Sequence, residues 1–224
     1  MAAASILFGM GLAKWNMLPY RAVLTIARTA IGLDTDRPRP AVNYYVRRTD
    51  QFHRLPGGAD VLVIGDSLVE QGEWNELLAP LAAHNRGIGN DTVYGLSLRM
   101  AQTCRHPYKT GVLMIGVNDA LNGILESDFA ARYRLLLQEL ARCTAHQVVH
   151  PIIVPDRSKA VASRVAAYNR EIVAIAQAKG AEVIDLNPIL APGGALTTEY
   201  SDDGLHLNGR GYLLWAKALK AAIR

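Results

Sequence analysis

The stretch DVLVIGDSL at residues 60–68 decides which fold to expect. Residues 61–64 are four consecutive apolar side chains, three of them β-branched, and such a run is typical of a strand buried on both faces. Gly65 and Asp66 then favour a tight turn, because glycine adopts backbone dihedrals that other residues avoid. The pattern predicts a strand that ends in a turn and continues into a helix, which is how a βαβ unit begins.

The same alternation of short apolar runs and longer helical patterns continues along the chain, and it predicts parallel strands joined by crossover helices. Further strands are expected at 82–85, 112–115, 148–154 and 182–186. Helices are expected at 73–80, 93–104, 127–143, 159–179 and 209–223. Because helices must cover both faces of a parallel sheet, we predict an α/β fold, a three-layer α/β/α sandwich around a parallel sheet of about five strands.

Polar residues follow the predicted strands, at the edge where open parallel sheets bind their ligands. They are Gly65-Asp66-Ser67, GIGND at 87–91, GVND at 116–119 and, before the last helix, DGLH at 203–206.

Ser67 is the candidate nucleophile among these residues. A turn opened by Gly65 would present its hydroxyl to the crevice, where an adjacent base could activate it for acyl transfer. The alternative is that Ser67 only caps the following helix, since serine is a favoured N-cap residue.

His206 is the candidate base, because a carboxylate three residues earlier can bond Nδ1 of the ring and direct Nε2 toward the serine. Asp203 is the favoured partner and Asp202 competes with it. His150 ends a predicted strand and could line the cleft, whereas the remaining histidines lack such a neighbour.

An oxyanion needs donors that do not titrate. The candidates are the backbone N–H of Ser67, a backbone N–H in the turn Gly89-Asn90, and the side-chain amide of Asn118. The alternatives are turn chemistry for the glycines and a cap or Asx turn for Asn118.

The four segments GDSL (65–68), NRGIGNDT (85–92), GVND (116–119) and DGLH (203–206) resemble the conserved blocks of the SGNH (GDSL-type) hydrolases in order and spacing. The resemblance covers residues 60–224. It implies a flavodoxin-like sheet, with Ser67, a second-block glycine, Asn118 and His206 as the name-giving residues and Asp203 as the triad acid. Among the flanking residues, Asp66, Asp119 and Leu205 are expected to contact substrate.

The second block departs from the family pattern. Aligned through Asn85 and residues 91–92, the usual oxyanion glycine falls on Asn90, and Gly89 lies one position earlier. Asparagine tolerates left-handed dihedrals, so the sequence leaves open whether Gly89 or Asn90 supplies the donor.

Composition excludes some classes of function. The chain has 224 residues and a net charge of +4, and residues 1–58 hold eight basic and three acidic residues. The nearly neutral remainder disfavours nucleic-acid binding. Cys104 and Cys143 are expected to be two buried free thiols, with a single bridge between them as the alternative. No metal or other cofactor is predicted.

The N-terminus differs from the rest of the chain. Residues 2–13 are apolar but too short to span a bilayer, and residues 17–33 have the pattern of an amphipathic helix. Residues 1–40 are predicted to be an extension and linker, and residues 41–224 the hydrolase domain. An extension that contacts a membrane surface through residues 1–33 would make the protein membrane-associated or exported; otherwise it would be cytoplasmic. The alternative is a helix packed on the domain or on a second subunit.

The predicted activity is ester hydrolysis through an acyl-enzyme on Ser67. Since no insertion is long enough to form a lid, an open site suited to short acyl groups is expected. The resemblance favours a small-ester esterase or a carbohydrate O-deacetylase acting on a saccharide ester. The alternatives are a lysophospholipase or thioesterase, an acyltransferase to a sugar hydroxyl, and an inactive binding module.

Overall fold

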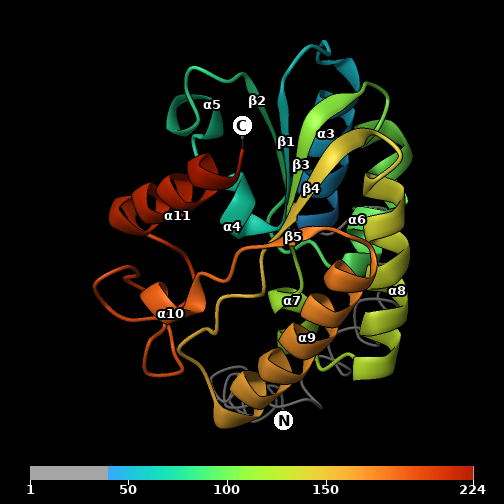
Figure 1. Ribbon diagram of the computed structural model, residues 1–224. Helices are drawn as coiled ribbons and strands as arrows, with labels where there is room; N and C mark the ends of the chain where they lie inside the picture. Colours follow the sequence, from blue (N-terminus) through green and yellow to red (C-terminus); the bar gives the residue numbers. More distant parts are fainter. Residues whose placement is uncertain (1–39, 224) are drawn as a thin grey trace, which may run out of the picture. The chain divides into compact units, whose positions relative to one another are not determined.

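The computed structural model describes residues 40–223 and contains a five-stranded sheet with helices on both faces (Figure 1). The strands are β1 (Val61–Gly65), β2 (Ala83–Gly87), β3 (Tyr108–Met114), β4 (Thr144–Val149) and β5 (Glu182–Val183). The helices are α3 (Pro40–Arg54), α4 (Ser67–Glu70), α5 (Trp74–Leu77), α6 (Val93–Thr103), α7 (Val117–Asn122), α8 (Glu126–Leu140), α9 (Lys159–Ala178), α10 (Asn187–Leu190) and α11 (Gly209–Ala222).

The sheet has the strand order β2-β1-β3-β4-β5, and every pairing is parallel. This is the order of flavodoxin-like folds, whose ligands bind where the connections from adjacent strands leave the sheet in opposite directions. In β1, Val63 pairs with Asn85 of β2 on one side and Val112 of β3 on the other. The predicted α/β/α sandwich is confirmed, and β3 is its central strand, with β1 and β4 on either side.

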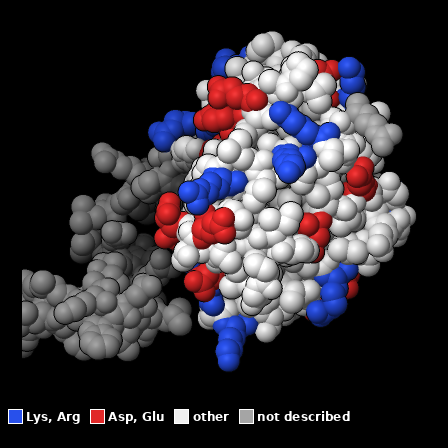
Figure 2. All heavy atoms as spheres, turned by 60° about the vertical axis from the view of Figure 1, so that its left-hand side comes forward, with Lys and Arg blue, Asp and Glu red and all other residues white. Residues whose placement is uncertain are grey.

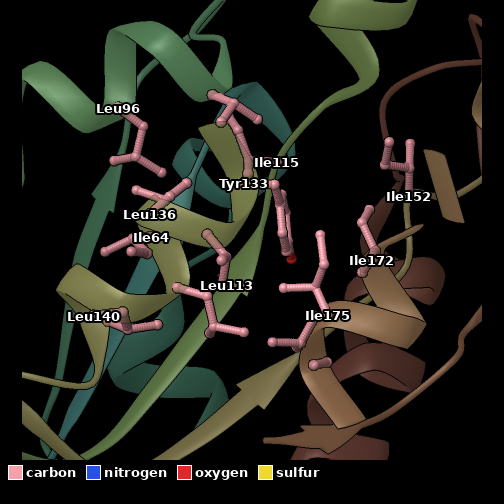
Figure 3. Close-up of a cluster of buried hydrophobic side chains, with 14 of the residues drawn as sticks. Ile64, Leu96, Leu113, Ile115, Tyr133, Leu136, Leu140, Ile152, Ile172 and Ile175 are labelled. Atoms are coloured by element: carbon pink, nitrogen blue, oxygen red, sulfur yellow. The ribbon is translucent and has the colours of Figure 1, made fainter. Parts of the chain in front are cut away.

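Alternate side chains of β1 enter two separate hydrophobic clusters, as expected for a strand with a period of two. Leu62 and Ile64 pack with α6, α8 and α9, and part of this cluster is drawn in Figure 3. Val61 and Val63 pack on the other face with α4, α5 and α11, including Trp74 and Trp215. All five β1 residues are buried, which explains why the strand appears in the sequence as an unbroken apolar run.

Some elements differ from their predicted bounds. Strand β4 begins at Thr144 and ends at Val149, whereas the prediction was 148–154. The first residues of this strand are mostly polar. Residues 150–154 follow the last paired residue of the strand and remain largely buried. The helix expected after the turn at Gly65 was predicted without bounds, and α7 and α10 were not predicted, since four to six residues are too few to show a helical period. Helix α3 was not predicted either.

The two cysteines form a disulfide, which corrects the expected free thiols. Cys104 follows α6 and Cys143 precedes β4, and their Cα atoms are 5.3 Å apart. Adjacent packing of α6 and α8 brings these positions together, and the 39-residue separation in sequence gave no indication of that distance.

The location predicted from the N-terminal segment is also corrected. Within residues 40–223, no helix combines the length and the apolar character needed to cross a bilayer. The predicted segments 1–33 and 34–39 lie outside the described residues. The boundary at residue 40 stays a prediction; residues Tyr45–Arg224 form one compact unit. Acidic and basic side chains are interspersed on the face of this unit shown in Figure 2.

Candidate active site

Ser67 stands at the point where β1 passes into α4. Asp66 is the N-cap of α4, and its carboxylate accepts the N–H of Leu68 at 3.0 Å. Ser67 is therefore the first helical residue, and the alternative role as a cap is wrong. The strand end has to be glycine, because a Cβ on Gly65 would lie 2.0 Å from the carbonyl oxygen of Met114.

The structure brings Ser67, His206 and Asp203 into one hydrogen-bonded line. Ser67 Oγ lies 3.0 Å from His206 Nε2, although 139 residues separate them in sequence. His206 Nδ1 lies 2.7 Å from Asp203 Oδ2. The bond to a carboxylate requires a proton on Nδ1, which leaves Nε2 free to accept the proton of the hydroxyl.

The turn before α11 fixes the Asp203 carboxylate. Asp203 Oδ1 accepts the backbone N–H groups of Leu205 and His206 at 2.9 and 2.8 Å. The hydrogen bond from the His206 side chain, followed by the one from its backbone, holds the pKa of Asp203 well below its ordinary value. Asp202 has no hydrogen bond or ion pair among the described residues, so the geometry selects Asp203 as the carboxylate that orients the ring.

The second block forms a β-turn over residues 88–91, in which Asp91 N–H donates to the Ile88 carbonyl at 3.2 Å. Asn90 occupies the third position with φ of 62°, a conformation that glycine and asparagine tolerate best. Gly89 N–H is bound to Glu70 Oε2 at 2.9 Å. Asn90 N–H has no acceptor among the described residues, and neither has Ser67 N–H.

Asn118 lies in the first turn of α7 and is directed at the same β-turn. Its Nδ2 donates to the carbonyl oxygen of Asp91 at 2.9 Å, which places the amide beside the residues that follow β2. An amide nitrogen carries two hydrogens, so one remains for a second acceptor.

Three buried carboxylates support these segments, and two of them correct the prediction that they contact substrate. Asp66 and Asp119 are 1% and 2% exposed, and Asp119 accepts the N–H of Val93 at 3.1 Å. Burial raises the pKa of Asp66 to about 7 and that of Asp119 to about 6. Both side chains turn inward to hold helix starts, where a substrate cannot reach them. The predicted substrate contact of Leu205, which is partly exposed, stays a prediction.

The third carboxylate, Asp91, forms a buried ion pair with Arg99 at 2.8 Å. Arg99 also donates to the carbonyls of Gly65 and Arg86, and so joins the ends of β1 and β2 to α6. Neither Arg99 nor Glu70, the acceptor of Gly89 N–H, was predicted from the sequence. Each is a single charged residue in a helical segment, which gives no sign of a role. For Glu70, the one available signal was an acidic residue at a fixed distance after the GDSL segment.

His150 does not line the cleft, which corrects another expectation. It is fully buried, with Nδ1 2.9 Å from the Ile184 carbonyl, and its Nε2 accepts the indole N–H of Trp215 at 3.0 Å. Burial lowers the pKa of His150 to about 4, so the ring is neutral at pH 7. It packs β4 against α11.

The sequence profile of the GDSL-like lipase/acylhydrolase family matches residues 63–214. The chain belongs to this family. The match contains both the serine after β1 and the histidine before α11, and it begins after α3. As a member of the family the chain is a GDSL-type hydrolase.

Solved structures share its fold at low sequence identity. A Streptococcus pneumonia protein, provisionally described as a platelet activating factor, is 22% identical, with a TM-score of 0.70 over 91% of this chain and 99% of that one. A GDSL-like lipase from Bacteroides thetaiotaomicron is 19% identical, with a TM-score of 0.68 over 80% and 96%. An acetylxylan esterase from Geobacillus stearothermophilus is 18% identical, with a TM-score of 0.58 over 76% and 96%. A search of curated proteins found no match.

Proposed function

We propose that this GDSL-type hydrolase cleaves carboxylic esters through an acyl-enzyme on Ser67. The observation that carries the proposal is the line from Ser67 Oγ to His206 Nε2 at 3.0 Å and from His206 Nδ1 to Asp203 Oδ2 at 2.7 Å. A serine hydroxyl is a weak nucleophile until an adjacent base takes its proton, and this geometry supplies that base.

In the proposed mechanism, Ser67 Oγ attacks the ester carbonyl carbon while His206 Nε2 takes the hydroxyl proton. The imidazolium is stabilised by Asp203, and it then gives the proton to the departing alcohol. Water repeats the attack on the acyl-enzyme, with His206 again as base, and releases the acid and the free serine.

The oxyanion is assigned three donors: Ser67 N–H, Asn90 N–H and the Asn118 side-chain amide. Asn90 is chosen over Gly89 because Gly89 N–H is already bound to Glu70, whereas Asn90 N–H has no acceptor in the described part of the chain. A well-aimed donor of this kind typically contributes about 3 kcal/mol to transition-state stabilisation.

The substrate proposed first is a short acyl ester, such as an O-acetyl group on a saccharide. The side chains of Asp203 and His206 are 52% and 31% exposed, so the site is open and suits a small acyl group on a bulky alcohol. The fold shared with acetylxylan esterases supports the same choice.

A second candidate is a longer-chain ester. A pocket of about 520 Å³ lies between α5 and α11, with Leu77, Tyr212 and Leu213 among its lining residues. It shares Gln71 and Leu207 with the pocket that contains His206, so an apolar chain could extend into it from the site.

One experiment tests both the acyl-enzyme mechanism on Ser67 and the acyl chain length of the substrate. Hydrolysis of p-nitrophenyl esters from acetate to dodecanoate is measured for the wild type and for Ser67→Ala, with folding checked by circular dichroism. We expect Ser67→Ala to lose at least about 10³-fold in kcat, because removing a triad member leaves only binding and oxyanion stabilisation. Wild-type rates should be highest for acetate; a maximum at eight carbons or more would favour the second candidate. Undiminished turnover by Ser67→Ala would exclude the mechanism.

A further inference from the structure

Helix α3 reaches the oxyanion turn through a chain of two contacts. Arg48 of α3 forms an ion pair with Glu70 of α4, with 3.2 Å between Nε and Oε1. The other carboxylate oxygen, Glu70 Oε2, accepts the N–H of Gly89 at 2.9 Å. The side chains of Arg48 and Glu70 are only 26% and 16% exposed, so bulk water screens this pair less than it would screen a surface pair.

Other contacts hold α3 in register with the site. The hydroxyl of Tyr45 donates to the carbonyl of Gly95 in the first turn of α6 at 2.6 Å. The ring of Phe52 lies under the guanidinium of Arg48 at 4.6 Å and that of Arg86, from β2, at 4.9 Å. Helix α3 precedes the residues that match the family profile, so the match gives it no role.

We propose that Arg48 and Glu70 are positioning residues that aim the oxyanion turn. The inference rests on the proposed function, in which Asn90 N–H is a donor to the oxyanion. Glu70 binds the N–H of Gly89 and thereby fixes the orientation of the Ile88–Gly89 peptide, which directly precedes the Gly89–Asn90 peptide that carries the proposed donor. The next N–H in the turn, that of Asn90, is left for the substrate.

Arg48 has an electrostatic role in this arrangement. The Glu70 carboxylate lies one peptide unit from the proposed donor, and its negative charge opposes the negative charge that develops on the substrate oxygen. The guanidinium of Arg48, with Nε 3.2 Å from Glu70 Oε1, weakens this opposing effect. Loss of Arg48 alone should therefore slow the reaction more than loss of Arg48 together with the charge of Glu70.

The test compares four variants of the full-length chain: Arg48→Leu, Glu70→Ala, Glu70→Gln and the double variant Arg48→Leu/Glu70→Gln. We expect Arg48→Leu and Glu70→Ala to lower kcat about 10- to 100-fold with KM nearly unchanged, since misplaced or opposed donors act on the transition state. Glu70→Gln keeps an acceptor for Gly89 N–H and should stay within about 3-fold of the wild type. The double variant should be at least about 5-fold faster than Arg48→Leu, because the opposing charge is gone.

Affinity for a trifluoromethyl ketone, whose adduct with Ser67 carries an oxyanion, should fall in parallel with kcat across the series. Arg47→Leu and Glu76→Gln are matched controls, because both residues are exposed and neither side chain has a described hydrogen bond or ion pair. They should retain wild-type kinetics. Thermal melting is recorded for every variant, and if Arg48→Leu does not fold, Arg48→Gln replaces it in both the single and the double variant.

A wild-type kcat in Arg48→Leu would overturn this inference, and so would a double variant no faster than Arg48→Leu. The proposed function would still hold in either case, provided that turnover depends on Ser67. A wild type without Ser67-dependent turnover would overturn the proposed function, and the inference with it.

Discussion

Asp202 and Asp203 are adjacent carboxylates in very different surroundings. Asp203 holds the His206 ring and accepts two backbone N–H groups, and its pKa is lowered chiefly by the hydrogen bond from His206. Asp202 has none of these contacts among the described residues. The two side chains have the same chemistry, so a difference in activity between an Asp202 variant and an Asp203 variant must come from their positions.

We predict that Asp203→Asn lowers kcat by about 10²- to 10⁴-fold, because an amide at this position favours the wrong tautomer of the ring. Asp202→Asn should stay within about 2-fold of the wild type, as expected for an exposed side chain outside the hydrogen-bonded line. Steady-state kinetics with p-nitrophenyl acetate at pH 8 would measure both. Equal losses in the two variants would show that the histidine does not depend on Asp203 in particular.

At the residue level, the sequence predicted which side chains converge but not how buried each one is. Ser67, Asp203 and His206 could be selected because their types and spacing match a known chemistry. Asp66 and Asp119 lie in the same motifs, yet they are almost fully buried. Burial depends on neighbours distant in sequence, such as Val93, whose backbone N–H donates to Asp119, and a motif contains no information about them.

Long helices were predicted well because each carries several turns of pattern. Helix α9 spans 159–178 against a predicted 159–179, and α6 spans 93–103 against 93–104. The predicted bounds of strand β4 were displaced by several residues. The strand begins in polar residues and apolar residues follow its end, so tertiary position, and not hydrophobicity, decides where pairing starts and stops. The Arg48–Glu70 pair could not be predicted at all, since it joins a helix outside the family motifs to one inside them.

The ends of α6 and α8 are joined by the Cys104–Cys143 disulfide, which closes a loop of 39 residues. A cross-link of this length restricts the unfolded chain, so we predict that the Cys104→Ser/Cys143→Ser variant loses about 2–4 kcal/mol of unfolding free energy. Urea unfolding of the oxidised protein and of the variant would measure it. Thiol titration of the denatured protein, purified without reductant, is the control and should find no reactive thiol; two per chain would contradict the bridge.

For the whole molecule, the alternation of apolar runs and helical patterns was sufficient to predict the layered sheet. The right-handed crossover and the need to cover both faces leave few other arrangements for such a pattern. The alternation of apolar runs and helical patterns does not predict which side chains connect the sheet to the helices. His150 is an example: it directly follows β4, and its ring bonds Trp215 of α11 instead of facing the cleft.

Burial of the His150 ring makes stability depend on pH. The folded-state pKa of His150 is lowered to about 4 from 6.5, so the unfolded chain takes up a proton first as the solution is acidified. The stabilising contribution of the neutral ring is complete above pH 6.5 and falls as the pH drops toward 4. Asp66 and Asp119 act in the opposite direction, because their pKa values are raised to about 7 and about 6. Nearby Asp185 favours the charged ring, but burial outweighs it.

The contributions of Asp66 and Asp119 cancel in the difference in unfolding free energy between a His150 variant and the wild type, because both proteins contain them. His150→Gln should be less stable than the wild type at pH 7, since the glutamine amide does not place its donor and acceptor where the ring nitrogens meet the Ile184 carbonyl and the Trp215 indole. Between pH 7 and pH 4.5 the gap in unfolding free energy should narrow by about 2–3 kcal/mol, as only the wild type loses the histidine contribution. Urea unfolding at both pH values measures the gap, and His146→Gln, in the preceding strand β4 and partly exposed, is the matched control. A gap that stays constant or widens on acidification would mean that the ring is not held neutral between β4 and α11.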